Sequence, residues 1–249
     1  MEQNKFGFFH RFVRTPLQEL FASTSHEEMS SQALFRHTIR EARNKAAWEM
    51  PLTEVRFVVV DTETTGFQPG NDALLSVGAV EVLGNIVREK RMHSLVRPDP
   101  AQSIPPHVVE LTGLRDEDVA SAPPLREVML LFLQFVHDAV LIAHHAGHDM
   151  RFLNAGLKKT YKAHLPHRVI DTVDVACWLH PELSSYTLDD LLALYEIPVR
   201  GRHTADGDAQ MTAELWSCFV NQALARGVST LGELIEVVVL AKREKGMSL

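Results

Sequence analysis

Short unbroken apolar runs mark the expected strands of the first half of this chain. Residues 57–60 are Phe-Val-Val-Val, and the run ends at Asp61. Such a run is typical of a strand that is buried on both faces. Two more apolar segments, 74–82 and 86–96, follow with Gly84-Asn85 between them, a dipeptide that favours a hairpin turn. Three successive strands without an intervening helix predict an antiparallel meander.

The second half of the chain alternates helical stripes with short apolar runs. Apolar residues recur at helical spacing over residues 125–138, and residues 140–143 form another buried strand. This alternation predicts an α/β fold, with a mixed sheet whose faces are covered by helices. The remaining expected elements are a short helix within 104–114, a helix from near Asp149, a strand at 169–170, and helices at 172–179, 188–194 and 206–224.

Both ends of the chain are expected to add helices to this central unit. Ser25 and Glu28 have the spacing of a capping box that begins a helix near the N-terminus, and Thr230 and Glu233 repeat it near the C-terminus. The predicted organisation has three parts: a helical extension over 1–50, a central domain over 51–225, and a C-terminal helix within 226–249 that packs on the domain or on a partner.

Charge and cysteine content narrow the classes of function. The 249 residues carry a formal net charge of −7, which argues against a protein that coats nucleic acid by bulk electrostatics. An enzyme that grips one nucleic-acid end remains compatible with this charge. Cys177 and Cys218 have no paired spacing, which indicates neither a zinc site nor a disulfide framework and fits a reducing compartment. No segment reads as a membrane span, so we expect a cytoplasmic protein without a membrane partner.

Two acidic residues follow the first apolar run at once. Asp61 and Glu63 are two residues apart, which in an extended chain places both side chains on one face. Gly66 then ends the strand. Partial burial of two carboxylates is costly unless a cation neutralises them, and oxygen ligands suit Mg²⁺ or Mn²⁺. The alternative is an exposed acidic pair in a turn.

Further chemically active side chains lie at a strand end and at a helix start. Asp149 stands where the strand at 140–143 passes into a helix, and its alternative role is that of a helix cap. Thr204 is the expected cap of a later helix, so that His203 precedes this helix and Asp208 lies in its first turns. A loop imidazole beside a helix-anchored carboxylate suits a base next to a metal ligand; the alternative is a solvated loop histidine.

Taken together, the segments 61–66, 143–149 and 203–209 resemble the motifs of the DEDDh class of 3′–5′ exonucleases. This is the DnaQ-like group that includes the proofreading epsilon subunit of bacterial DNA polymerase III. The resemblance covers about residues 54–225 and implies a ribonuclease-H-like α/β fold. His145 and His148 depart from it, because they stand where the family usually has Asn and Phe.

The resemblance also implies roles for individual residues. Asp61 would bridge two Mg²⁺ or Mn²⁺ ions, with Glu63 and Asp208 on the side of the attacking water and Asp149 holding the second ion directly or through water. His203 would be the general base. The terminal nucleotide would be cradled by the backbone of Thr64, Thr65 and Gly66 and by the side chain of Phe67.

The implied reaction is hydrolysis of single-stranded DNA from its 3′ end, releasing nucleoside 5′-monophosphates, in proofreading or repair. Three alternatives stay open: an exoribonuclease or oligoribonuclease acting on short RNA, a metal-dependent phosphodiesterase acting on small nucleotides, and a non-catalytic module that tethers a polymerase. The partners that the resemblance suggests are a polymerase subunit or a second copy of this chain, bound through the terminal helices.

Overall fold

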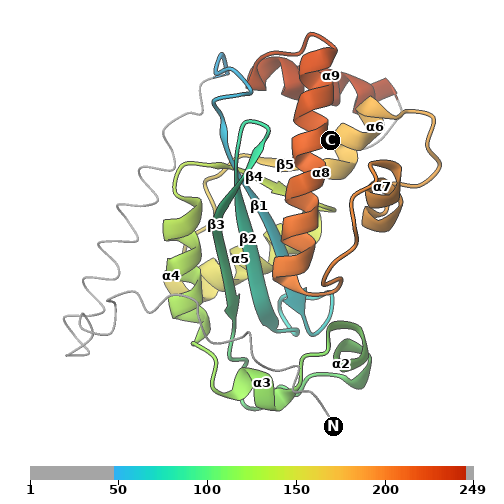
Figure 1. Cartoon of the computed structure of the whole chain (residues 1–249). Helices are drawn as coiled ribbons and strands as arrows, with labels where there is room; N and C mark the ends of the chain where they lie inside the picture. The colour runs from blue at the N-terminus through green and yellow to red at the C-terminus, as the bar shows by residue number, and fades with distance from the viewer. Residues whose placement is uncertain (1–47, 245–249) are drawn as a thin grey trace.

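A five-stranded mixed sheet forms the centre of the computed structural model, which describes residues 48–244 (Figure 1). The strand order is β3-β2-β1-β4-β5. The predicted N-terminal extension, including its capping box at Ser25 and Glu28, lies almost entirely outside the described residues. The strands are β1 (Arg56–Thr64), β2 (Leu74–Leu83), β3 (Ile86–Leu95), β4 (Val140–Ala143) and β5 (Val169–Asp171). The helices are α2 (Pro106–Thr112), α3 (Asp116–Ala120), α4 (Leu125–Val136), α5 (Gly147–Tyr161), α6 (Thr172–Leu179), α7 (Leu188–Leu194), α8 (Ala205–Ala225) and α9 (Leu231–Glu244).

The first three strands form the antiparallel meander that the sequence predicts. β1 pairs antiparallel with β2, and β2 pairs antiparallel with β3. Gly84 in the turn between β2 and β3 has a left-handed φ of 60°, and a Cβ atom there would lie 2.5 Å from the carbonyl oxygen of Thr53. A glycine is therefore required at this turn. β4 and β5 extend the sheet on the other side of β1, both parallel to it.

Helices cover both faces of the sheet, and β1 is buried between them. Phe57 and Val59 face the core formed with α6, α7, α8 and α9, where Phe57 packs edge-on against the fully buried Trp216. Val58 and Val60 face the opposite core, formed with α4 and α5. Burial of all four side chains confirms that the apolar run is a strand covered on both faces.

Two helices differ from the sequence-based expectation. α3 was not predicted, because its five residues are too few to show a helical period. α5 begins at Gly147, so Asp149 is its third residue and the interpretation of Asp149 as a helix cap is wrong. The helix starts early because the carboxylate of Asp171 accepts hydrogen bonds from the backbone N–H groups of His145 and Ala146, at 3.0 and 2.8 Å.

The C-terminal helix α9 begins at the predicted capping box. The backbone N–H of Thr230 donates to the Glu233 carboxylate at 3.0 Å, and the N–H of Glu233 donates to the Thr230 hydroxyl at 3.3 Å. Lys242, in the last turn of α9, pairs with Asp174 of α6 at 2.9 Å. The helix thus packs on the central unit of the same chain. None of the helices in residues 48–244 is long and apolar enough to cross a membrane.

Candidate metal centre

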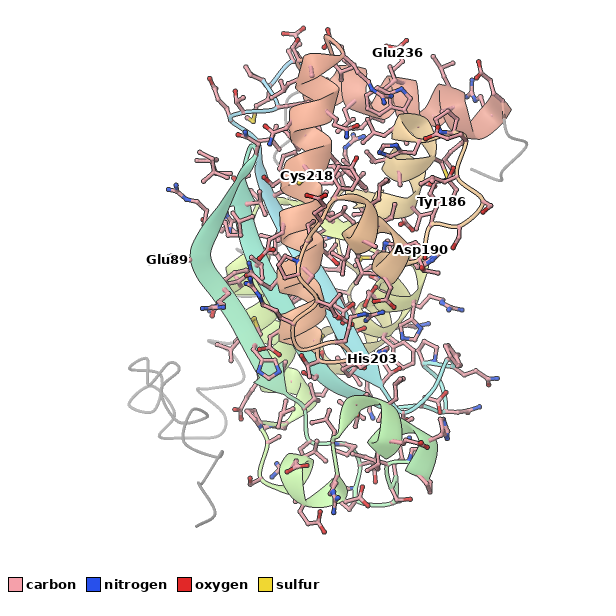
Figure 2. The ribbon with its side chains drawn as sticks, turned by 45° about the vertical axis from the view of Figure 1, so that its right-hand side comes forward. Glu89, Tyr186, Asp190, His203, Cys218 and Glu236 are labelled. Carbon is pink, nitrogen blue, oxygen red and sulfur yellow. The ribbon has the colours of Figure 1, made fainter. Side chains whose placement is uncertain are left out.

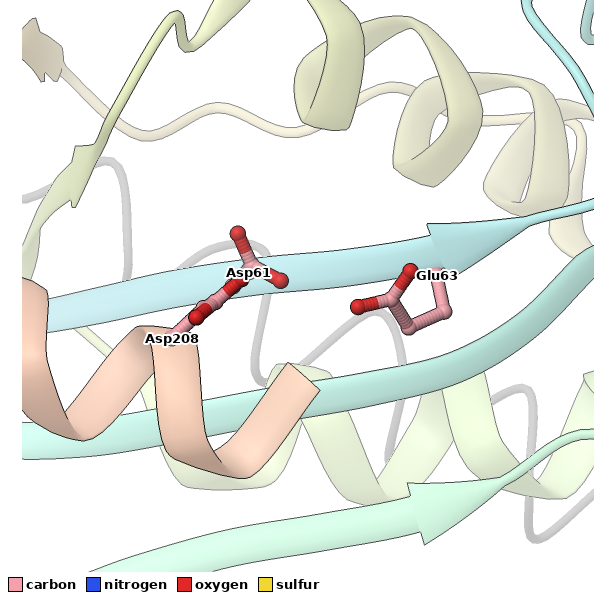
Figure 3. A group of neighbouring side chains, drawn as sticks. All are labelled: Asp61, Glu63 and Asp208. Atoms are coloured by element: carbon pink, nitrogen blue, oxygen red, sulfur yellow. The ribbon is translucent and has the colours of Figure 1, made fainter. Parts of the chain in front are cut away.

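Three carboxylates converge where β1 meets the first turn of α8 (Figure 3). Asp61 and Glu63 project from the same side of β1, as their spacing predicts, and Asp208 projects from α8. One oxygen atom from each of these side chains lies within 4.8 Å of the other two.

Local sequence holds the first turn of α8 against the sheet. The Thr204 hydroxyl caps the helix by accepting a hydrogen bond from the backbone N–H of Gly207 at 3.2 Å, as predicted. Gly78 of β2 lies under this turn, where a Cβ atom would collide with the backbone of Ala205. The absence of a side chain at Gly78 therefore lets α8 approach closely enough for Asp208 to join the two acids of β1.

Asp149 approaches the same place from α5. Its side chain is only 3 % exposed, and its Oδ1 accepts a hydrogen bond from the hydroxyl of Thr62 at 2.7 Å. Thr62 lies between the two acids of β1 in sequence. Burial is the main reason that the pKa values of Asp61 and Glu63 are raised, and the negative charge of Asp149 adds to the effect. Three of the four acids that the sequence singled out therefore share one cluster, and the fourth, Asp149, is hydrogen-bonded to the residue between two of them.

The carboxylates of this centre hold protons more tightly than free carboxylates do. Loss of water on burial is the main cause in each case, and repulsion from the other acids of the centre adds to it for Asp61 and Glu63. These effects raise the pKa of Glu63 and of Asp149 to about 7, and raise the pKa of Asp61 well above its usual value. The pKa of Asp208 is also raised, mainly by burial.

The donor atoms fit a hard divalent cation. The Oδ1 atom of Asp208 is buried and has no hydrogen-bond partner among the described residues, so one acceptor in the cluster is available to a ligand. Carboxylate oxygens are the ligands that Mg²⁺ and Mn²⁺ prefer. A cation would also remove the mutual repulsion of the acids.

Divalent metal is therefore expected to stabilise the fold, and more so at high pH. Because the raised pKa values let the folded protein bind more protons than the unfolded one, the free energy of unfolding falls as pH rises from about 4 to about 7. Calorimetric melting in Mn²⁺ and in EDTA should show a larger metal-induced rise in Tm at about pH 8 than at about pH 5. Asp61→Asn should melt higher than wild type in EDTA at the upper pH and lose most of the metal effect. A wild-type Tm that is insensitive to Mn²⁺ would contradict this account.

His203 lies in the loop just before α8, as predicted (Figure 2). Its backbone has a left-handed φ of 59°, and its N–H donates to the Oδ2 atom of Asp208 at 3.3 Å. This hydrogen bond fixes the backbone of His203 next to the carboxylate cluster. The imidazole itself is half-buried.

Arg202 is a member of the site that the sequence reasoning missed. Its Nη1 donates to the Oδ2 atom of Asp208 at 2.5 Å, while its Nε and Nη2 contact the carboxylate of Asp189 at 2.7 and 3.2 Å. The guanidinium thus joins the start of α7 to the start of α8. Its positive charge acts to lower the pKa of Asp208 and partly opposes the effect of burial. The signal in the sequence is that Arg202 directly precedes His203, in a segment that also carries Asp206 and Asp208, where a positive side chain can balance the acids.

The loop after β1 contains the residues predicted to hold a terminal nucleotide. Thr64 donates to the carbonyl of Gly66 at 2.7 Å and lies 3.2 Å from Nε2 of His148. Thr65 is buried, and its hydroxyl accepts a hydrogen bond from the N–H of Ala73, so this side chain holds the loop rather than facing a ligand.

Gly66 and Phe67 have different roles in the same loop. A Cβ atom at Gly66 would lie 2.5 Å from the carboxylate of Asp72, so a larger residue would have to displace that side chain. The ring of Phe67 is 77 % exposed and stands edge-on to the ring of His148, with 5.8 Å between the centroids. His148 also contacts Phe152 of α5. His148, which stands where the usual motif has Phe, therefore packs between Phe67 and Phe152. We call the surface formed by these three rings the aromatic wall.

His145, the other departure, takes no part in this wall. It is exposed, it has a left-handed φ of 54°, and its ring packs edge-on against His144. His144 hydrogen-bonds to the hydroxyl of Thr172 at 2.8 Å, and burial lowers its pKa to about 4. His144 is therefore a neutral side chain that supports the turn before α5.

Comparison of the sequence with known proteins finds similarity to exonucleases and to polymerases. Residues 58–216 match the family model RNase_T, described as exonuclease. A PolC-type DNA polymerase III from Halalkalibacterium halodurans is 33% identical over 180 residues, which are 72% of this chain and 12% of the relative. A putative bifunctional exonuclease/endonuclease protein from Mycobacterium tuberculosis is 36% identical over 201 residues, covering 76% of this chain and 31% of the relative. The chain thus spans less than a third of the length of these two relatives.

Solved structures share the fold at lower identity. E. coli exonuclease I in complex with a dT13 oligonucleotide superposes with a TM-score of 0.61 and 17% identity, covering 69% of this chain and 42% of that one. Exonuclease X in complex with 5′ overhanging duplex DNA gives a TM-score of 0.59 and 23% identity, covering 73% of this chain and 99% of that one. With a ribonuclease-H-like sheet, acids at the end of its central strand and a family match over most of the described residues, this chain belongs to the RNase_T exonuclease family, the DnaQ-like group.

Proposed function

We propose that this chain is a divalent-metal-dependent 3′–5′ exonuclease that releases nucleoside 5′-monophosphates from single-stranded DNA. The observation that carries the proposal is the cluster of Asp61, Glu63 and Asp208, with an unpartnered buried oxygen on Asp208. Exonucleases of this family depend on divalent metal, and the cluster supplies the matching ligands.

In the proposed chemistry, the four acids hold the metal ions. Asp61, Glu63 and Asp208 would hold a Mg²⁺ or Mn²⁺ ion, and Asp149, fixed by Thr62, would help to hold a second one. Bound divalent cations supply charge stabilisation and lower the pKa of water.

In the proposed reaction, the proton acceptor is His203, in the loop before α8. His203 would take a proton from the attacking water as the water oxygen bonds to phosphorus. The bond between phosphorus and the 3′ oxygen of the preceding nucleotide breaks, and the released 3′ oxygen takes a proton from the solvent. The products are a shortened strand with a 3′ hydroxyl and a nucleoside 5′-monophosphate.

The aromatic wall is proposed to hold the terminal nucleotide. Phe67 is exposed in the loop that follows β1, four residues after Glu63, and base stacking on an aromatic side chain contributes about 1–3 kcal/mol. We expect Phe67→Ala to raise KM for an oligonucleotide by roughly 5–150-fold, with a much smaller change in kcat. Phe67→Tyr, which keeps the ring, is the matched control. Steady-state kinetics measures both, and an unchanged KM for the alanine variant would remove Phe67 from the substrate site.

The experiment that tests the proposed function compares matched substrates. Single-stranded DNA and RNA of one sequence, labelled at the 5′ end, are digested in Mg²⁺, and the products are separated by length. We expect a ladder that shortens from the 3′ side and faster digestion of DNA. Labelled mononucleotide at the outset would show the opposite polarity. Faster digestion of RNA would favour an exoribonuclease, and activity confined to dinucleotides would favour a small-nucleotide phosphodiesterase.

We place this activity in proofreading or repair, with a polymerase as the proposed partner. Support comes from the relatives named PolC-type DNA polymerase III, in which the matching segment is a small part of a much longer chain. Co-purification of the full chain with the polymerase of its own cell tests this role. A chain that is purified alone and digests DNA without it would favour repair.

A further inference from the structure

A shallow groove of about 570 Å³ lies along the exposed side of α5, the helix that carries Asp149. Gly147 and Met150 line one part of it, and Lys158 and His164 line another. Pro69, from the loop after β1, forms part of its border. The groove is therefore built by the helix that carries Asp149 and by the loop that carries Phe67.

The groove adjoins the aromatic wall. His148 and Asp149 lie between the two groove residues Gly147 and Met150 in sequence. Pro69 follows Phe67 by two residues, and Phe67 contacts the ring of His148. A strand whose terminal nucleotide sits at this wall can thus continue directly into the groove.

The groove carries positive charge in a chain that is negative overall. Arg151 and Lys158 line it and are exposed, and neither belongs to any ion pair among residues 48–244. Arg151 donates only its Nε to the backbone carbonyl of Gly147, at 3.1 Å. Lysines 159 and 162 are exposed at the same end of the helix. Against a net charge of −7, these cations form a local site for an anionic polymer.

We propose that this groove, which we call the α5 groove, binds the phosphate backbone of the strand just upstream of the nucleotide being removed. The inference rests on the proposed function. Eleven residues separate Gly147 from Lys158, which is about 16 Å of helix at 1.5 Å per residue. This length matches about five nucleotides of stacked strand at 3.4 Å each. Contacts to phosphate predict binding that favours long strands and tolerates any sequence.

The test is to remove the two unpaired cations and measure binding apart from cleavage. Fluorescence anisotropy with labelled dT13 and with a labelled dinucleotide, in EDTA, is recorded for wild type and for Arg151→Gln/Lys158→Gln. Each phosphate contact contributes about −0.7 to the slope of log K against log salt for a single strand. The double variant should therefore bind dT13 roughly tenfold more weakly near 0.1 M salt, with a slope shallower by about 1.4. Binding of the dinucleotide should be unchanged.

Two control variants make the result specific to the groove. Arg151→Lys/Lys158→Arg keeps the charge and should bind dT13 like wild type, which also shows that these positions tolerate substitution. Arg88→Gln/Lys90→Gln removes the same charge from β3, at the end of the sheet away from the acids, and should also bind like wild type. An equal loss in this β3 variant would mean that bulk charge, and not the groove, governs binding.

Cleavage in Mg²⁺ separates this inference from the proposed function. The glutamine variant should digest a dinucleotide with a kcat/KM like that of wild type, and digest dT13 less efficiently. Unchanged affinity and salt slope for dT13 would overturn the α5 groove even if wild type is an exonuclease. A wild type that binds dT13 through the groove but cleaves nothing would refute the proposed function alone.

Discussion

His203→Asn is expected to cleave a single-stranded oligonucleotide about 10²–10⁴-fold more slowly than wild type, the usual loss when a general base is removed. Asparagine tolerates the left-handed backbone that His203 adopts, so the loop before α8 should keep its shape. The backbone N–H that donates to Asp208 also remains. The variant should therefore bind Mn²⁺ with nearly wild-type affinity, because only the proton acceptor has been removed.

Single-turnover rates and calorimetric Mn²⁺ titration measure the two effects separately. A variant that loses Mn²⁺ affinity would make His203 a ligand. One that keeps the wild-type rate would show that another group takes the proton.

Asp208→Asn is expected to have the other large effect, through the metal. The neutral amide removes a charged ligand from a hard-cation site, and loss of even a supporting contact in metal sites costs about 10–100-fold in affinity. We expect at least that loss in Mn²⁺ affinity, and a cleavage rate that partly recovers as Mn²⁺ is raised. In the same variant Arg202 keeps its contacts with Asp189.

Asp206→Asn is the matched control, because it makes the same change one half-turn earlier in α8. The Asp206 side chain is 53% exposed and lies 4.0 Å from His93, outside the three-carboxylate cluster. It should keep wild-type metal affinity and rate. If Asp206→Asn and Asp208→Asn behave alike, charge near the helix start matters and coordination by Asp208 does not.

The sheet could be predicted because its signals are local. The apolar run before Asp61, the turn at Gly84 and the caps at Thr204 and Thr230 each depend on a few neighbouring residues. Spacing along a strand also placed Asp61 and Glu63 on one face without knowledge of the fold. The acids were therefore the most predictable part of the site.

Contacts between distant segments could not be predicted in this way. The start of α5 depends on Asp171, more than twenty residues later, and Asp149 depends on Thr62 across 87 positions. The bridge from Arg202 to Asp189 exists only because α7 ends up beside the loop before α8. No periodicity or motif encodes these pairs, since packing alone brings their side chains together.

The measurement that tests the central claim most directly is digestion of 5′-labelled single-stranded DNA by wild type and by Asp61→Asn, each in Mg²⁺ and in EDTA. The proposed metal centre predicts a ladder that shortens from the 3′ end only for wild type in Mg²⁺, because Asp61 lies in the carboxylate cluster. The two proteins should be prepared in parallel, so that a contaminating nuclease would appear in both. A ladder that persists in EDTA, or one that Asp61→Asn produces at the wild-type rate, would contradict the account.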